Sequence, residues 1–377
     1  MRVGIDARYL NGQYSVIANY SENLLLHLAK LRPKHQFVVY VHPNYNKMLK
    51  LGDNFKIVKY RARPVSLNTL FTFSRRVNED NLDLLHSLFP LSPIWFKKTL
   101  MVTVHDLQPL VVPEFTGHRP GPIKKAYDVF YWWCYSLTIR RANWILSVSD
   151  ATRKELIELF PETRHKSLVC YEGLDEEFLT PPAEFSMRKT VERFHLPERY
   201  LLYIGSTRPN KNLYNMVRAF GKVVKGASDG KDLIFILVVT PDRFFKDCLR
   251  LIEELRIEDN VRILSNVTDE EKKVMYACAS ALLFVSKNEG FGFPLIEAQS
   301  QEVPVITSNV SSLPEIGRDS AIQVDPDNAD QIAESIIRVL SDNPLREELI
   351  RKGKENSSRF TWDKTARNVL DAYNILT

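Results

Sequence analysis

Short apolar runs alternate with longer amphipathic stretches along almost the whole chain, and this alternation limits the fold more than any other feature. The clearest runs are Arg2 to Ile5, Gln36 to Val41, Leu100 to Val104, Tyr200 to Ile204 and Ala281 to Val285. Short, continuously apolar runs are typical of parallel strands that are buried on both faces. Strands separated by helices therefore predict an α/β fold with parallel sheets.

Length and composition narrow the class of protein further. A chain of 377 residues favours two domains of ordinary size. A net charge of +5, from 51 basic and 46 acidic residues, is too small to indicate a nucleic-acid partner. The four cysteines lack metal-ligand or disulfide spacing, and the chain shows neither a signal peptide nor an apolar run of transmembrane length. We therefore expect a cytoplasmic protein.

Two carboxylates flank a glycine loop that directly follows the last of these apolar runs. The loop turns through Gly290 and Gly292, and Pro294 is typical of the first turn of a helix. A helix N-terminus presents free N–H groups and partial positive charge, which favour a phosphate. Glu289 in the loop and Glu297 in the helix are suitable acceptors for sugar hydroxyls. From spacing alone, solvated glutamates beside an ordinary glycine turn remain an open alternative.

A basic loop follows the apolar run that ends at Ile204. Gly205 comes first, and Arg208 and Lys211 then lie at the expected start of a helix. A strand that ends in glycine, followed by cations at a helix start, favours the binding of a pyrophosphate. The alternative is a glycine turn with solvated charges.

A histidine directly follows the apolar run Leu100 to Val104. His105 therefore lies at the carboxyl end of a strand, where ligands bind in open α/β sheets. Its imidazole is suited to acid–base work or to binding a hydroxyl. A purely structural hydrogen bond at the strand end is the alternative.

An aromatic helix with basic ends is predicted over 122–142. Such a helix is suited either to a membrane interface or to packing on the sheet. We favour packing, because its aromatic residues occupy most of the helix circumference rather than one stripe. The aromatic residues are Tyr127, Phe130, Tyr131, Trp132, Trp133 and Tyr135, and the flanking basic residues are Lys124, Lys125, Arg140 and Arg141.

The stretch from Glu289 to Glu297 resembles the motif of two glutamates separated by seven residues in glycosyltransferase family four, the retaining nucleotide-sugar enzymes with a GT-B fold. His105, in the tetrapeptide TVHD, and the segment Pro209 to Asn212 also resemble this family. The resemblance covers nearly the whole chain.

The fold that the resemblance implies consists of two Rossmann-like domains facing each other across a cleft. We expect an acceptor-side domain over 1–175 and a donor-binding domain over 186–360. The final helix, 361–377, is expected to pack back on the first domain.

The resemblance also implies roles for the site residues. Lys211 and Arg208 would stabilise the nucleoside diphosphate that leaves, with the Gly205 loop as its cradle. Glu297 would bind the ribose hydroxyls, and His105 would contact the donor sugar and the acceptor side. Glu289 would bind the donor sugar, with the N–H groups of four loop residues nearby: Gly290, Phe291, Gly292 and Phe293. No metal and no other cofactor is expected.

The chain departs from the family pattern at several positions. Val16 and Ala18 stand where glycines are usual near the donor phosphates, so a close approach of that backbone is an open question. Arg208 lies two positions before the place of the family's arginine. Glu172 stands where the family usually has asparagine.

The predicted activity is a retaining, metal-independent sugar transfer to a glycan or lipid-linked acceptor in lipopolysaccharide or O-antigen synthesis. GDP-mannose is the first choice of donor, because the opening GIDARYL with TVHD resembles bacterial mannosyltransferases of polysaccharide assembly. UDP-hexose or dTDP-rhamnose donors, and a sugar-nucleotide epimerase of the same fold, are the alternatives. Peripheral contact with the inner face of the cytoplasmic membrane is a further alternative to a fully soluble enzyme.

Overall fold

The computed structural model describes residues 1–13, 15–113, 115, 121–226 and 232–376. These residues form two structural units. Unit 1 comprises Met1–Gly173 with Thr361–Thr377, and unit 2 comprises Leu174–Phe360. The boundary between them lies at Gly173, two residues before the predicted end of the first domain, and unit 2 begins before the predicted start at 186.

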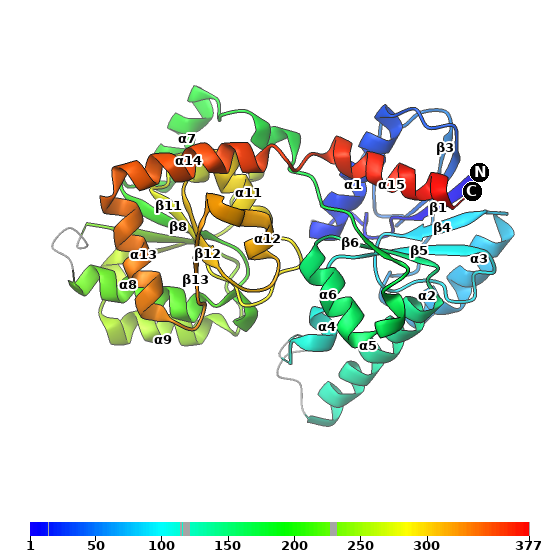
Figure 1. The fold of residues 1–377 in the computed structure, drawn as a ribbon, viewed down its shortest axis with the longest axis horizontal. Coiled ribbons are helices and arrows are strands. Elements are labelled where there is room, and N and C mark those ends of the chain that lie inside the picture. The colour runs from blue at the N-terminus through cyan, green and yellow to red at the C-terminus, as the bar shows by residue number, and fades with distance from the viewer. Residues whose placement is uncertain (14, 114, 116–120, 227–231, 377) are drawn as a thin grey trace. The chain divides into compact units, whose positions relative to one another are not determined.

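A parallel sheet forms the centre of unit 1 (Figure 1). Within the described residues it has seven strands in the order β3-β2-β1-β4-β5-β6-β7. The order reverses between β1 and β4, and open α/β sheets bind ligands at the carboxyl ends of the strands beside such a reversal. The strands are β1 Arg2–Asp6, β2 Gln36–Val41, β3 Phe55–Lys59, β4 Leu84–Ser87, β5 Thr99–Val104, β6 Trp144–Ser147 and β7 Ser167–Val169.

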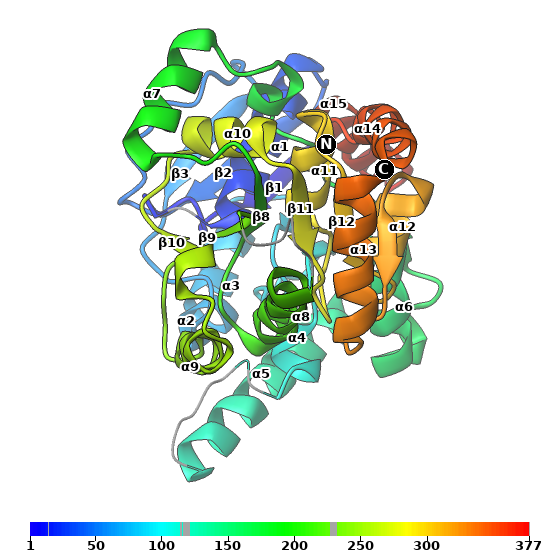
Figure 2. The same ribbon diagram turned by 90° about the vertical axis from the view of Figure 1, so that its left-hand side faces the viewer.

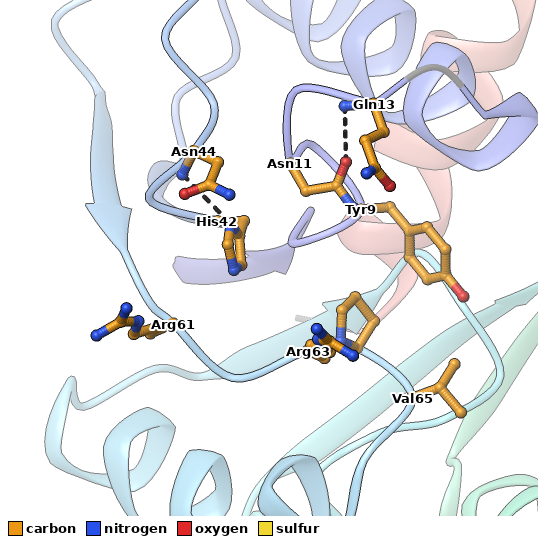
Figure 3. Close-up of a pocket in the computed structure, with 9 residues that line it drawn as sticks. Tyr9, Asn11, Gln13, His42, Asn44, Arg61, Arg63 and Val65 are labelled. Atoms are coloured by element: carbon orange, nitrogen blue, oxygen red, sulfur yellow. Dashed lines mark hydrogen bonds between the residues drawn. The ribbon is translucent and has the colours of Figure 1, made fainter.

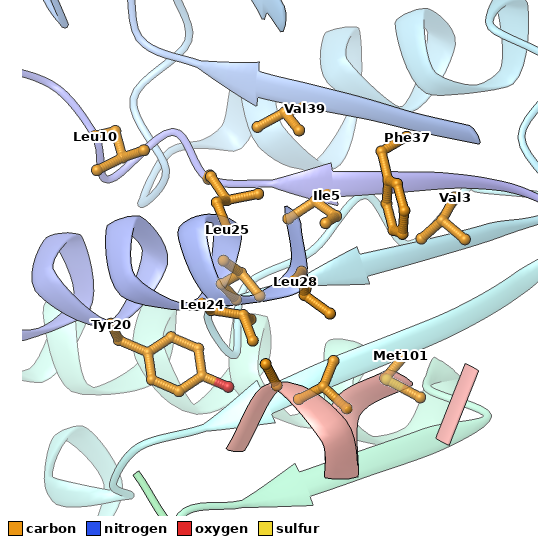
Figure 4. Packing of buried hydrophobic residues seen from close by; sticks show 14 of the residues in the cluster. Val3, Ile5, Leu10, Tyr20, Leu24, Leu25, Leu28, Phe37, Val39 and Met101 are labelled. Carbon is orange, nitrogen blue, oxygen red and sulfur yellow. The ribbon is translucent and has the colours of Figure 1, made fainter. Parts of the chain in front are cut away.

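Helices cover both faces of this sheet. Side chains alternate along a strand, so β2 sends Phe37 and Val39 into one core and Val38 and Tyr40 into the other. Helices α1 and α15 close the first core (Figure 4), and α3, α5 and α6 close the second. The helices are α1 Val16–Lys30, α2 Leu67–Leu70, α3 Thr72–Glu79, α4 Gln108–Val111, α5 Gly121–Arg141, α6 Asp150–Leu159 and α15 Trp362–Ile375.

Helix α15 belongs to the core of unit 1. Trp362 and Tyr373 are almost fully buried there. The Tyr373 hydroxyl lies 2.7 Å from Nδ1 of His86, whose Nε2 lies 2.8 Å from Oγ1 of Thr103. Burial lowers the pKa of His86 to about 3, so this histidine is neutral and its network is structural.

A second parallel sheet forms the centre of unit 2. Within the described residues it has six strands in the order β10-β9-β8-β11-β12-β13, and the order reverses between β8 and β11. Helices α8, α9 and α13 lie on one face and α10, α11 and α14 on the other (Figures 1 and 2). The strands are β8 Tyr200–Ile204, β9 Ile234–Val238, β10 Val261–Leu264, β11 Ala281–Phe284, β12 Val305–Ser308 and β13 Ile322–Val324. The helices are α7 Glu184–Phe194, α8 Leu213–Gly226, α9 Phe245–Leu255, α10 Asp269–Cys278, α11 Phe293–Ser300, α12 Leu313–Gly317, α13 Ala329–Ser341 and α14 Asn343–Ser357.

The predicted fold class is confirmed: two parallel-sheet, Rossmann-like units are present. For helix α5 the structure shows packing on the sheet, and the membrane interface stays a prediction. Its second half packs on the sheet and buries Cys134, Tyr135 and Ile139. Trp132 and Trp133 are 46% and 44% exposed, and in Figures 1 and 2 the first turns of α5 extend beyond the rest of unit 1.

Candidate active site

Two of the predicted donor-binding residues of unit 2, Lys211 and Glu289, meet at the reversal of its strand order. Strands β8 and β11 are neighbours, and the loops that follow them, 205–212 and 285–292, leave the same edge of the sheet. Open α/β sheets bind ligands at this place, because the connections diverge there to opposite faces.

Lys211 and Glu289 form the centre of this half of the site. Nζ of Lys211 lies 2.7 Å from each carboxylate oxygen of Glu289. The side chains are only 19% and 9% exposed. An ammonium group has three N–H donors, so the third can reach a ligand oxygen while the pair stays intact. The arrangement holds a cation and a hydroxyl acceptor side by side, as a sugar phosphate requires.

The loop that carries Glu289 is fixed by hydrogen bonds from two neighbouring loops. The Asn210 side chain donates to the carbonyl of Asn288 at 3.2 Å, and the Lys287 N–H donates to the carbonyl of Asn210 at 2.8 Å. The Ser311 hydroxyl accepts from the N–H of Glu289 at 3.0 Å and donates to its carbonyl at 2.8 Å. The carboxylate is therefore held in a preorganised position.

Gly292 permits the sharp turn into helix α11. Its φ is +120°, and a Cβ there would lie 2.8 Å from Cδ2 of Leu313. Only glycine adopts this backbone without strain. Pro294 occupies the first turn of α11, as predicted. Phe291 was predicted to contact the ligand, but its side chain is buried, so only its backbone is available for that contact.

Glu297 lies on α11, where it accepts a hydrogen bond from the Tyr276 hydroxyl at 2.8 Å. Burial raises the pKa of Glu297 to about 7, although the Lys272 cation and the Tyr276 hydrogen bond oppose this shift. A carboxylate that ionises near neutrality is typical of a functional site.

Arg208 and Gly205 are placed differently from Lys211. Arg208 is exposed and lines a separate pocket of about 490 Å³ beside α8 and α9. A Cβ at Gly205 would lie 2.7 Å from the hydroxyl oxygen of Tyr203, which donates to the carbonyl of Ser206. Gly205 is thus required for packing, and its role as a phosphate cradle stays a prediction.

The histidine predicted for unit 1 is buried beside a carboxylate. Nδ1 of His105 lies 2.8 Å from Oε1 of Glu172, and Nε2 lies 3.0 Å from the carbonyl oxygen of Leu88. The edge of its ring packs on Tyr20, with the ring centroids 4.7 Å apart. Burial is the largest single influence and lowers the pKa of His105, but the hydrogen bond and charge of Glu172, together with the Leu88 carbonyl and the charge of Asp106, outweigh it, so the pKa is raised.

Both nitrogens of His105 lie within hydrogen-bonding distance of oxygen atoms, and its raised pKa favours the charged, doubly protonated ring. Both polar atoms of the histidine are thus already used within unit 1. A direct contact between this ring and a sugar requires one of these hydrogen bonds to open. The predicted sugar contact of His105 stays a prediction.

The residues that replace the family's glycines lie at the start of α1. Val16 begins the helix and is 51% exposed, and the Ala18 N–H donates to the Ser15 hydroxyl at 3.0 Å. This Ser15 cap uses one of the free N–H groups of the first turn.

Three residues in these contacts were not assigned a role from the sequence. Glu172 is 67 positions from His105, and its departure from asparagine was the only signal available. Tyr276 and Ser311 had no such signal, because they act through hydrogen bonds that only the tertiary structure reveals.

Two family models match most of the chain between them. The model "Glycosyltransferase Family 4" matches residues 17–178, and "Glycosyl transferases group 1" matches residues 188–356.

Among curated proteins, the chain is 28% identical over 279 residues to O-antigen chain mannosyltransferase B of Escherichia coli. That match covers 73% of this chain and 70% of the relative. It is 27% identical over 227 residues to the O-antigen chain mannosyltransferase RfbU of Salmonella typhimurium, covering 60% of this chain and 57% of that protein.

Among solved structures, the sucrose-phosphate synthase of Thermosynechococcus elongatus superposes with a TM-score of 0.76 at 18% identity. The superposition covers 100% of this chain and 98% of that one, and it establishes the fold. The chain therefore belongs to glycosyltransferase family 4 and is a glycosyltransferase with the GT-B fold.

Proposed function

We propose that the protein transfers mannose from GDP-mannose to a glycan or lipid-linked acceptor in the synthesis of a cell-surface polysaccharide such as O-antigen. The names of the curated relatives support mannose as the sugar. The single structural observation that carries the proposal is the Lys211–Glu289 pair at the strand reversal of unit 2.

The reaction breaks the bond between C1 of the sugar and an oxygen of the diphosphate, and it forms a bond between C1 and an acceptor hydroxyl oxygen. Negative charge grows on the diphosphate as it leaves. Lys211 donates to that oxyanion together with the free N–H groups at the start of α11. Glu289 accepts hydrogen bonds from hydroxyls of the sugar, and Glu297 accepts them from the ribose.

We propose that the sugar keeps its anomeric configuration and that no metal takes part. The acceptor then attacks from the face that the diphosphate leaves, and its proton passes to a diphosphate oxygen. The pair Asp325 and Asp327, which has the spacing of a metal-binding motif, is engaged elsewhere in the structure. Asp327 pairs with Lys287, and Asp325 accepts the Asp327 N–H at 2.9 Å.

We further propose a cytoplasmic enzyme that contacts the membrane through the exposed part of α5. No helix within the described ranges is both long and apolar enough to cross a membrane. Trp132, Trp133 and Tyr127 are each more than 40% exposed, and Lys124 lies on the same part of the helix. Aromatic and basic side chains of this kind are suited to a membrane interface.

The first experiment is a thermal-shift series with GDP, UDP and dTDP, because a ligand that binds the folded state raises the unfolding temperature. We expect GDP to give the largest shift. The second measures sugar release from GDP-mannose, UDP-glucose and dTDP-rhamnose, with and without EDTA.

We expect turnover of GDP-mannose in both buffers. A larger thermal shift with UDP or dTDP, together with turnover of the matching nucleotide sugar, would identify that nucleotide sugar as the donor in place of GDP-mannose. Loss of activity in EDTA that manganese restores would refute metal independence. Conversion of the sugar nucleotide to its epimer, with no sugar released, would identify an epimerase instead. When an acceptor is added, the anomeric configuration of the glycoside formed follows from the one-bond C1–H1 coupling in its NMR spectrum.

A further inference from the structure

A second pocket lies in unit 1, at the carboxyl ends of β1, β2 and β3. Its volume is about 610 Å³. Figure 3 shows the side chains around it, which come from the three loops that follow these strands. The lining residues are Tyr9, Asn11, Gln13, His42, Asn44, Arg61, Arg63, Pro64 and Val65.

Both formally charged residues that line this pocket are arginines. Across the described ranges, Arg61 and Arg63 form no ion pair and their side chains make no hydrogen bond. Nδ1 of His42 accepts the N–H of Asn44 at 3.2 Å, so its Nε2 carries the proton of the neutral ring and is a donor. The pocket thus combines two unpaired guanidinium groups with an imidazole N–H, and none of its described lining residues carries a carboxylate.

The walls of the pocket are held in place by buried contacts. Arg8 is 1% exposed, pairs with Asp6 at 2.7 Å and donates to the carbonyl of Ala62 at 3.1 Å. Because Ala62 lies between the two pocket arginines, this bond fixes the segment that carries them. On the opposite wall, Gly12 has a φ of +83°, and a Cβ there would lie 3.0 Å from the carbonyl oxygen of Asn44. The two loops therefore pack closely.

We infer that this pocket binds an anionic group, a phosphate or a carboxylate, of the acceptor. The planar fork of a guanidinium group matches the oxygens of either anion and pairs with them through two hydrogen bonds. Tyr9, Pro64 and Val65 add an apolar wall against which a sugar ring can pack. This inference rests on the proposed function and names a chemical class for its acceptor: a negatively charged glycan.

Direct binding to the full chain tests the inference. Saturation-transfer NMR at millimolar ligand compares mannose 1-phosphate, glucuronate and the neutral methyl α-mannoside. The variant is Arg61→Gln/Arg63→Gln, and the matched control is Lys56→Gln/Lys59→Gln, which removes two cations from β3 outside the pocket. A Lys211→Gln variant shows whether mannose 1-phosphate also binds in unit 2, because binding there should weaken when Lys211 is replaced.

We expect at least one anionic probe to bind the wild type, the β3 control and the Lys211→Gln variant alike, and the arginine variant about tenfold more weakly or not at all. Preference for mannose 1-phosphate assigns the anion as a phosphate, and preference for glucuronate assigns it as a carboxylate. The inference is overturned if neither anion binds, if the neutral glycoside binds equally well, or if the arginine variant is unaffected.

A separate measurement distinguishes this inference from the proposed function. The arginine variant should still bind GDP and hydrolyse GDP-mannose at the wild-type rate when no acceptor is present. If the wild type neither binds GDP nor hydrolyses GDP-mannose, the proposed function fails. If it does both while the arginine variant binds every anion normally, only the inference about this pocket fails.

Discussion

Replacing Glu172 by glutamine should destabilise unit 1 in a strongly pH-dependent manner. The substitution keeps the shape of the side chain but removes the charge that faces His105. In the wild type, Glu172 acts together with the Leu88 carbonyl and the Asp106 charge to outweigh burial, so the pKa of His105 is above its ordinary value of 6.5. In the variant, burial is no longer outweighed and should lower that pKa.

The sign of the effect follows from the two protonation equilibria. In the wild type, the raised pKa adds stability that is fully present below pH 6.5 and is lost as the pH rises through the folded-state value. In the variant, the unfolded chain takes up a proton that the folded state resists, so stability falls below pH 6.5. The difference between the two proteins should therefore grow as the pH falls.

The expected magnitude comes from the burial of the pair. The His105 and Glu172 side chains are 9% and 2% exposed. Removing one partner of a buried ion pair costs about 3–5 kcal/mol, which is the loss we expect at pH 5.5. At pH 8.5, where the imidazole of the variant is neutral, the loss should shrink to about 0.5–1.5 kcal/mol, the value of one ordinary hydrogen bond.

Tryptophan fluorescence during urea unfolding measures this loss selectively. The five tryptophans of the chain are Trp95, Trp132, Trp133, Trp144 and Trp362. All of them belong to unit 1, so the fluorescence transition reports that unit and not unit 2.

The control is Glu162→Gln, which removes an exposed ion pair with Arg140 in the same unit. The Glu162 and Arg140 side chains are 47% and 66% exposed, so the loss of unfolding free energy should stay below about 1 kcal/mol at both pH values. If Glu172→Gln shows an equal loss at pH 5.5 and 8.5, or a greater loss at pH 8.5, His105 is not held as an imidazolium and the reasoning fails.

The remaining predictions concern unit 2 and α5. Lys211→Ala should lower kcat more than Arg208→Ala does, because Lys211 is preorganised beside Glu289. We expect the lysine variant to raise the activation free energy by very roughly 2–4 kcal/mol. Steady-state kinetics of both variants test this, and a lower kcat for Arg208→Ala than for Lys211→Ala would reverse the assignment. Glu297→Gln should stabilise unit 2 by up to about 3 kcal/mol above pH 7 and not at all below pH 4.5, because burial of this side chain makes its ionisation oppose folding. Urea-dependent hydrogen exchange of peptides from unit 2, read by mass spectrometry at pH 4.5 and 8, measures this stability, and equal effects at the two pH values would contradict the prediction. Replacing Trp132 and Trp133 with serine should abolish flotation of the protein with anionic liposomes at low salt, and unchanged flotation would exclude membrane contact through α5.

The fold was predictable because the same sequence feature, a short apolar run for each buried strand, occurs many times along the chain. Each buried strand is a short apolar run, so an error in one of them leaves the α/β pattern intact. Individual boundaries were less secure: the aromatic helix predicted over 122–142 is α5 Gly121–Arg141, and the predicted start of the second domain at 186 lies beyond Leu174, where unit 2 begins. Helix α5 was difficult for a physical reason, since a helix that is buried over one half and exposed over the other has no single amphipathic pattern.

The candidate site was predictable as a set of residues but not as a set of contacts. The motif identified Lys211 and Glu289 singly, yet they are 78 positions apart and nothing in the sequence pairs them. Their pairing changes the expected behaviour of Lys211, because its removal leaves a nearly buried carboxylate without a partner. The pocket arginines were missed because basic residues after an edge strand are typical of ordinary solvated surface.

The path of the chain through unit 1 has a consequence for its synthesis. The sheet of this unit is complete by β7, but Trp362 and Tyr373, which fill one of its two cores, are translated only after the whole of unit 2. Unit 2 is continuous in sequence and can fold while the first sheet still exposes an apolar face. We therefore expect unit 2 to complete its fold before unit 1 does, with this face of the first sheet exposed while about half of the protein is translated.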